Sequence, residues 1–157
     1  MKKRKVYGMN GKIVVRKVEP KEREKALHLA LDVFMKFEAP EYPEEGVNHF
    51  KEFVSNRKET AKLTMYGAFL DETIIGVLAM RKQGTHVSLF FVDEAYHRQG
   101  IGRAMFEYMI SLTKPGNLTV HAAPYAVEAY KRLGFVATDS ERTEDGVRYT
   151  PMQMNAE

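Results

Sequence analysis

The fold is decided by residues 86–106, which read HVSLFFVDEAYHRQGIGRAMF. The apolar run from Val87 to Val92 has the length and composition of a buried strand. After a short polar link, Gly100 and Gly102 open a segment whose apolar side chains recur at the helical positions i, i+4, i+7, i+8 and i+11. These side chains are Ile101, Met105, Tyr108, Met109 and Leu112. The two glycines are therefore predicted to lie where a buried strand is followed by a helix.

Glycines at the start of a helix allow a phosphate to approach the backbone closely. The N–H groups of the first turn lack intrahelical partners, and the helix dipole favours negative charge there. Arg103 can add a charge-assisted hydrogen bond. The P-loop pattern G-x-x-x-x-G-K-S/T is absent, and Met105 stands where a Rossmann fingerprint needs a third glycine or alanine. The glycines alone leave two interpretations open, a phosphate-binding turn of another kind and a tight turn without a ligand.

Residues 96–104, YHRQGIGRA, resemble the acetyl-CoA motif of the GCN5-related N-acetyltransferase (GNAT) family, usually written Q/R-x-x-G-x-G/A. One departure is visible, because His97 stands at the Gln/Arg position. The resemblance implies acetyl-CoA as co-substrate, with its diphosphate held mainly by backbone N–H groups. The residues implied to bind the coenzyme at this turn are His97, Arg98, Gln99, Gly100, Ile101, Gly102 and Arg103.

A second block, TVHAAPYAVEAYKRLGF at residues 119–135, resembles the family's later motif, a tyrosine-bearing helix that ends in Gly-Phe. Ala126, Ala129, Tyr130 and Leu133 lie on one predicted helical face, and Gly134 suits the C-cap. The resemblance implies that Ala126 and Tyr130 contact the coenzyme and that Tyr130 is the general acid. A phenol, with a pKa of about 10, can protonate a departing thiolate whose thiol has a pKa of about 8.5. The alternative is a core tyrosine with a capped hydroxyl.

The resemblance, which extends from about residue 12 to 154, also assigns roles to the central strand. It implies that this strand diverges from its neighbour near its end, so that the main chain of Phe90, Phe91 and Val92 is available to the pantetheine arm. Strand alternation predicts that His86 and Ser88 project to the same side as Phe90 and Val92.

The predicted general base is His86, because an imidazole with a pKa of about 6.5 suits an acceptor that loses its proton near neutrality. His121 is a second candidate, and a solvent-exposed strand-end histidine is the alternative for His86. The chain departs from the family pattern here too, because it has His121-Ala122-Ala123 near the strand end, where the family often has an asparagine.

Glu38, Glu41 and Tyr42 lie in a proline-interrupted connection that lines the acceptor pocket in the family. We predict Glu38, Tyr42 and Ser88 as substrate-binding residues, because an acidic and an aromatic side chain suit a cationic amine. A solvated turn is the alternative for this connection.

Composition excludes several classes of chemistry. The chain has 157 residues, which suits one domain, and it has no cysteine, so disulfides, thiolate metal sites and a cysteine nucleophile are excluded. Direct acetyl transfer is therefore expected, and no metal. The net charge of +3 suits a polyanionic coenzyme, and no basic face interleaved with aromatic residues predicts a nucleic-acid partner. Residues 1–11 are expected to form a flexible basic leader, and the lack of a long apolar run predicts a cytoplasmic protein without a membrane partner.

The predicted order of elements is β-α-α-β-β-β-α-β-α-β-β, an α/β fold with a mixed, mostly antiparallel central sheet flanked by helices. The predicted strands are residues 12–18, 62–70, 73–81, 86–92, 118–121, 135–138 and 147–154. One helix follows Pro20, and a second spans about residues 44–57. The function expected from the resemblance is transfer of acetyl from acetyl-CoA to a primary amine of a small molecule or peptide. A non-catalytic acyl-CoA-binding or partner-binding module is the competing interpretation, and the family also suggests a homodimer.

Overall fold

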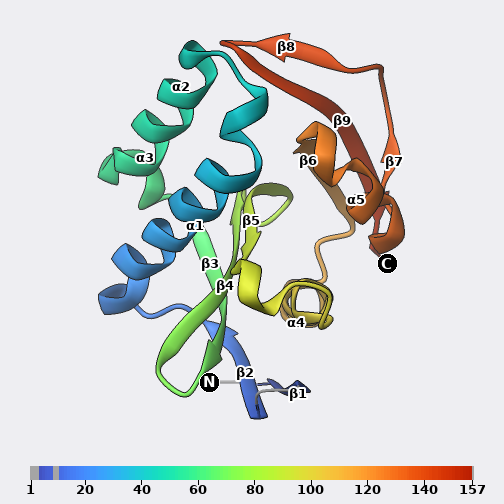
Figure 1. Cartoon of the computed structure of the whole chain (residues 1–157). Coiled ribbons are helices and arrows are strands. Elements are labelled where there is room, and N and C mark those ends of the chain that lie inside the picture. Colours follow the sequence, from blue (N-terminus) through green and yellow to red (C-terminus); the bar gives the residue numbers. More distant parts are fainter. Residues whose placement is uncertain (1–3, 9–10, 157) are drawn as a thin grey trace.

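The computed structural model describes residues 4–8 and 11–156, which form a nine-stranded sheet with helices on both faces (Figure 1). The strand order is β1-β2-β3-β4-β5-β6-β9-β7, and β8 pairs only with β9. Every pairing is antiparallel except that of β5 with β6. The strands are β1 (Arg4–Gly8), β2 (Gly11–Lys17), β3 (Thr64–Leu70), β4 (Thr73–Arg81), β5 (His86–Val92), β6 (Asn117–Ala122), β7 (Val136–Ala137), β8 (Arg142–Glu144) and β9 (Val147–Asn155).

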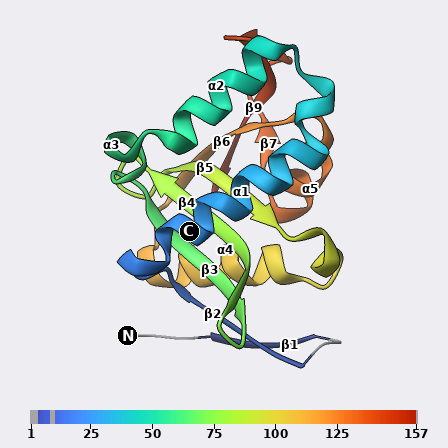
Figure 2. The same ribbon diagram turned by 60° about the vertical axis from the view of Figure 1, so that its left-hand side comes forward.

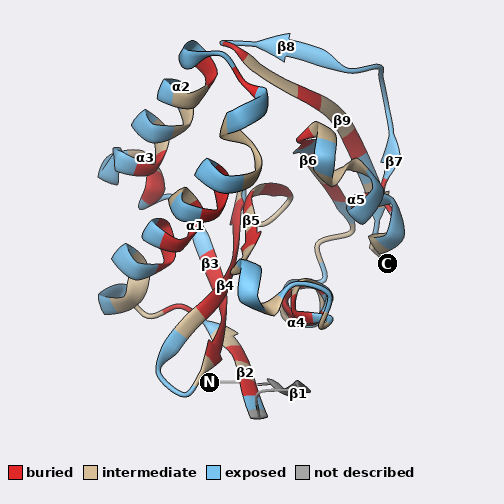
Figure 3. Ribbon diagram, in the orientation of Figure 1, coloured by how far each residue is buried: buried red, intermediate tan, exposed pale blue. Residues whose placement is uncertain are grey.

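Two groups of helices cover the sheet on opposite faces (Figure 2). One face carries α1 (Arg23–Phe37), α2 (Glu44–Ser55) and α3 (Arg57–Thr60), and the other carries α4 (Ile101–Thr113) and α5 (Val127–Leu133). Short 3-10 turns connect them: η1 (Pro20–Glu22), η2 (Ala39–Glu41), η3 (Glu94–Tyr96) and η4 (Pro124–Ala126). Buried residues concentrate on β3 to β5 and on the sheet-facing sides of α1 and α4 (Figure 3). The predicted mixed, mostly antiparallel sheet flanked by helices is confirmed.

Three predicted boundaries need correction. Residues 4–8, expected within a flexible leader, form β1, where Val6 pairs with Ile13 and thus adds a β-forming residue to the sheet edge. The last residue of that leader, Gly11, begins β2. Residues 1–3, 9 and 10 lie outside the described part of the chain. The helix predicted over 44–57 is divided at Asn56, whose side chain accepts a hydrogen bond from the Glu59 N–H and so caps α3. The short strand β8 was not predicted.

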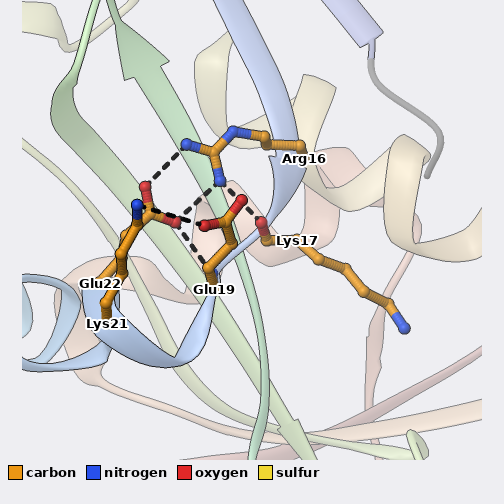
Figure 4. Close-up of polar contacts among 5 residues, drawn as sticks. All are labelled: Arg16, Lys17, Glu19, Lys21 and Glu22. Carbon is orange, nitrogen blue, oxygen red and sulfur yellow. Dashed lines mark hydrogen bonds and ion pairs between the residues drawn. The ribbon is translucent and has the colours of Figure 1, made fainter.

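The junction of β2 with α1 is fixed by a bidentate ion pair (Figure 4). The Arg16 guanidinium donates to both Glu22 carboxylate oxygens, at 2.8 and 2.7 Å, and lies 3.9 Å from the centre of the Phe69 ring. The same carboxylate accepts the Glu19 N–H at 2.9 Å. These hydrogen bonds, led by those from Arg16, lower the pKa of Glu22 to about 2. The pair therefore orients α1, whose C-terminal end reaches the site described below.

A bulge in β5 breaks the predicted side-chain alternation. Val87 pairs with Met80 and Leu89 with Ala79, so Ser88 is an extra residue relative to β4. Val87 consequently packs in the same apolar cluster as Phe90 and Val92, below α4. The prediction that His86 shares the side of Phe90 and Val92 is therefore wrong, because one inserted residue reverses the alternation before it.

The pairing of β5 with β6 ends early. It consists of His86 with Thr119 and Val87 with Val120, whereas β5 continues to Val92. The two strands diverge beyond this point, and the resulting gap in the sheet is where the candidate site lies (Figure 1).

Candidate active site

Two cavities meet beside the diverging end of β5. The first, about 370 Å³, lies over the start of α4 and is called the glycine-turn cavity. The second, about 360 Å³, lies between α1, α2, β5 and the β8–β9 hairpin and is called the aromatic cavity. Both are lined by Phe90, Tyr125, Ala126 and Tyr130. The two cavities are therefore adjacent, with Tyr130 at their common boundary.

The glycine turn leaves room at the backbone of the glycine-turn cavity. Gly100 caps α4 in the left-handed conformation, with φ +76°, and a Cβ added there would meet no atom within 4 Å. The first intrahelical hydrogen bond runs from the Ala104 N–H to the Gly100 carbonyl, at 3.0 Å. The N–H groups of residues 101–103 precede it and have no intrahelical acceptor. This backbone fits an anionic group, and the open space around Gly100 is large enough for one to approach.

The charge of the glycine-turn cavity is positive. Arg98, Arg103 and Arg132 line it, and among the described residues no acidic side chain does. The Arg103 guanidinium donates to the Arg132 carbonyl at 2.8 Å and so joins the first turn of α4 to the end of α5. A polyanion such as a diphosphate suits this lining.

His97 makes a contact that sequence reasoning missed. Its Nε2 lies 2.6 Å from the Val92 carbonyl oxygen, to which it donates a hydrogen bond in the tautomer protonated at Nε2. The Val92 carbonyl, expected to be available to a ligand, is thus already engaged. Of the other residues predicted to bind the coenzyme, Ile101 lines this cavity, whereas Gln99 does not and Phe91 lines only the aromatic one.

Tyr130 is buried between two aromatic rings. Its ring meets Phe90 and Phe135 edge-on, with centroids 5.9 and 5.4 Å away. Burial, then the nearby charge of Glu38 and the neighbouring Tyr125, raise the pKa of the Tyr130 phenol. Its hydroxyl has no hydrogen-bond partner in the part of the chain that the structure describes. Tyr130 is therefore a protonated phenol at the junction of the two cavities.

Glu38 brings a carboxyl group into the aromatic cavity. It follows the last residue of α1, and its N–H donates to the Phe34 carbonyl at 2.9 Å. Burial raises the pKa of Glu38 to about 7, although the nearby Tyr42 hydroxyl opposes the shift. The charge of Glu38 in turn raises the pKa of Tyr42, Tyr125 and Tyr130, in each case after burial, which is the largest cause. Glu38 thus lies near all three tyrosines and changes its charge close to neutrality.

His86 and His121 also line the aromatic cavity. His86 is 4% exposed, and its Nδ1 lies 2.7 Å from the Thr119 hydroxyl. Burial first, and the charge of Arg81 second, lower its pKa to about 3. The exposed His121 stacks on Tyr149 with centroids 4.2 Å apart, and the same two leading causes lower its pKa. Both imidazoles are therefore neutral near pH 7, and His86 is a weak base.

Several lining residues come from segments that sequence reasoning did not assign to the site. They are Arg81 at the end of β4, Tyr125 in η4, and Arg148 and Tyr149 in β9. The Tyr42 hydroxyl donates to the Arg148 carbonyl at 3.2 Å, which joins the α1–α2 connection to β9. Glu41, in that same connection, does not line the cavity. Tyr125 lies within the second motif, residues 119–135, but it is outside the predicted helical face and no pattern marks it as a site residue.

The roof of the aromatic cavity is a close backbone contact. A Cβ added to Gly46 in α2 would lie 2.2 Å from the carbonyl oxygen of Gly146, in the β8–β9 turn. His49 and Asp145 lie 4.0 Å apart across the same boundary. Only a residue without a side chain at position 46 lets α2 and the hairpin close over the cavity.

Comparisons with known proteins agree with this geometry. The family model described as an acetyltransferase (GNAT) domain matches residues 38–156. A solved structure from Rhodopseudomonas palustris, described as a GCN5-related N-acetyltransferase, superposes with a TM-score of 0.77 at 17% identity, covering 97% of this chain and 98% of that one. The PaiA N-acetyltransferase of Thermoplasma acidophilum, in complex with coenzyme A, gives 0.70 at 17% identity, covering 91% and 98%. The ribosomal-protein-S18-alanine N-acetyltransferase of Escherichia coli gives 0.64 at 21% identity, covering 92% and 94%.

One further comparison and a search for membrane-spanning helices are both negative. No curated protein sequence matches the chain. Within residues 4–8 and 11–156, no helix combines the length and the apolar character needed to cross a bilayer.

Proposed function

The chain belongs to the GNAT acetyltransferase family, and we propose that it transfers the acetyl group of acetyl-CoA directly to a primary amine of a small molecule or peptide. The observation that carries the proposal is the meeting of two different cavities at Tyr130. One is positively charged and lined by exposed main chain, and the other is aromatic and contains a carboxyl group. A ternary complex needs this arrangement, because both substrates must be held with their reacting atoms adjacent.

The glycine-turn cavity is proposed to hold the coenzyme, which supplies the acetyl group as a thioester. The N–H groups of Ile101, Gly102 and Arg103 would bind its diphosphate, and the guanidinium groups of Arg98 and Arg132 would balance its charge. The main chain of β5 beyond Val87, which has no strand partner on the β6 side, would pair with the extended arm. The coenzyme A complex of the PaiA structure, which shares the fold, supports this assignment.

Glu38 is proposed as the general base. With a pKa of about 7 it is half ionised at neutrality and largely ionised above it, and its burial strengthens its attraction for a cationic amine. His86 stays a prediction for the same role, but a pKa of about 3 makes it much less able to accept the proton of an ammonium group. Glu38 would therefore bind the amine as a cation and take its proton.

Tyr130 is proposed as the general acid. Its hydroxyl has no hydrogen-bond partner among the described residues and lies where the two cavities meet. A proton on this oxygen is available to the thiolate that departs when the amine takes the acetyl group. This role and that of Glu38 move one proton each, from the amine to the carboxylate and from the phenol to the sulfur.

The proposal is tested by measuring acetyl-CoA binding calorimetrically and thiol release across a panel of amines. Saturable binding together with amine-dependent thiol release and an acetylated product is expected. Binding without thiol release from any amine would favour the competing non-catalytic acyl-CoA module, and absence of binding would contradict both. The homodimer and the cytoplasmic location stay predictions.

A further inference from the structure

Arg81 differs from three other charged residues of the aromatic cavity. Arg148 pairs with Glu141 at 3.1 Å, and Asp145 lies 4.0 Å from His49. Glu144 accepts a hydrogen bond from the Tyr149 hydroxyl. Among the described residues, however, the Arg81 guanidinium forms neither a hydrogen bond nor an ion pair, and its Nε is buried without a partner. A buried donor without an acceptor is costly, unless a ligand supplies the acceptor.

A second unpartnered group lies in the same cavity. The hydroxyl of Ser88, the inserted residue of the β5 bulge, is buried and has no hydrogen-bond partner. Arg81 is paired across β4 and β5 with His86, two residues from Ser88. The guanidinium also lies close to both histidines, since its charge is the second cause, after burial, of their lowered pKa values. Arg81 and Ser88 thus both bring unpartnered hydrogen-bond donors to the cavity.

The opposite kind of charge enters through α1, where Glu38 lines the same cavity. The lining also has apolar rings, which include Phe50; its ring stacks on Phe34 with centroids 3.9 Å apart and meets Phe91 edge-on at 5.9 Å. A volume of about 360 Å³ suits a small molecule rather than a protein surface. The cavity is therefore complementary to a compact ligand with a cation, a carboxylate and an apolar body.

We propose that the acceptor is an amino acid with an apolar or aromatic side chain, whose carboxylate binds Arg81 and Ser88 while its amine faces Glu38. The inference rests on the proposed acetyl transfer and names its substrate class. A guanidinium binds a planar carboxylate through two parallel hydrogen bonds, which a ligand without a carboxylate cannot form. An acceptor without a carboxylate would leave both donors unpartnered.

The test compares phenylalanine, phenylalaninamide and phenethylamine in the wild-type protein and in Arg81→Met. Calorimetry measures the affinity of each ligand for the protein saturated with coenzyme A, and thiol release from acetyl-CoA measures kcat/KM. Taking the ratio of wild type to variant for each ligand cancels the differing basicities of the three amines. Arg148→Met is the matched control, because it removes an arginine that lines the same cavity but is already paired.

We expect Arg81→Met to weaken phenylalanine binding by roughly 10- to 100-fold, the usual range for a hydrogen-bonded charge, and to change the binding of the two amines that lack a carboxylate less than threefold. Ser88→Ala should give a smaller loss with the same selectivity, and Arg148→Met should leave the preference intact. Equal losses for all three ligands, or a wild-type protein that binds phenethylamine as well as phenylalanine, would overturn the inference. Arg81-dependent binding without turnover would uphold the carboxylate subsite and contradict the proposed acetyl transfer. Turnover without a preference for the carboxylate would uphold the acetyl transfer and contradict the subsite.

Discussion

The two cavities of this protein are built in different ways. The glycine-turn cavity is lined mainly by two contiguous segments, residues 96–103 and 125–133, and the main chain of the first contributes donors and space. The aromatic cavity is formed by side chains from α1, α2, β5, the β8–β9 hairpin and other elements. The affinity of a ligand bound by main-chain groups depends on backbone conformation, whereas the affinity of a ligand bound by side chains depends on which residues they are. Side chains of the aromatic cavity can therefore change the acceptor without altering coenzyme binding.

The largest expected effect comes from the boundary between the cavities. We predict that Tyr130→Phe lowers kcat about 1000-fold, in the range for loss of a general acid, and changes acetyl-CoA affinity less than threefold. Steady-state kinetics and calorimetry measure the two effects. Tyr125→Phe is the matched control, since Tyr125 also lines both cavities, and its kcat should fall less than fivefold. Full activity in Tyr130→Phe would remove this residue from the chemistry.

The next effect tests the carboxyl group of the aromatic cavity. Glu38→Gln should lower kcat/KM for the acceptor about 100-fold, and it should abolish the rise in wild-type activity whose midpoint lies at about pH 7. His86→Asn should reduce activity less than tenfold and keep that rise. If the rise in activity with pH is instead lost in His86→Asn, the general base is the histidine.

Glu38→Gln, which should lower activity, should raise stability above neutral pH. Because the pKa of Glu38 is raised from 4.5 to about 7, the folded protein holds a proton that the unfolded chain has lost between these values. The free energy of unfolding therefore falls as the pH rises from 4.5 to 7 and stays lower above it. Glu38→Gln should melt higher than the wild type at pH 8 and similarly to it at pH 4, as measured by calorimetry. A variant that is less stable at pH 8 would contradict the assignment.

A tenfold effect is expected at the glycine turn. Gly100→Ala should weaken acetyl-CoA binding about tenfold, because the added Cβ points into open space that the diphosphate would use. The left-handed conformation should also cost the alanine variant roughly 1 kcal/mol in stability. Gly116→Ala is the matched control, with φ +74° and the same open surroundings, but outside both cavities. It should lose comparable stability and keep its affinity. Equal affinities in the two variants would separate the glycine turn from coenzyme binding.

The smallest functional effect should come from the roof of the aromatic cavity. Gly46→Ala would force α2 away from Gly146 at a cost of about 1–3 kcal/mol in stability. We predict that the KM for the acceptor rises several-fold while acetyl-CoA affinity stays unchanged. An unchanged acceptor KM would show that the contact between α2 and the hairpin serves stability alone.

The difference in construction also explains which parts the sequence could predict. Gly100 and Tyr130 lie in contiguous motifs with helical spacing, so their elements were predicted with nearly the observed bounds. The pKa of Glu38 was not predictable, because it results from burial beside Tyr42 and Tyr125, which no local pattern brings together. The reversal of alternation at Ser88 was missed because a bulge depends on the pairing with β4 and not on the strand itself.

The most direct test of the account is a crystal structure of the protein with coenzyme A. The diphosphate should lie against the main-chain N–H groups of residues 101–103, with the sulfur within hydrogen-bond reach of the Tyr130 hydroxyl and next to the cavity that contains Glu38. A diphosphate bound elsewhere, or a sulfur directed away from Tyr130, would contradict the claim that the two substrates meet at this phenol.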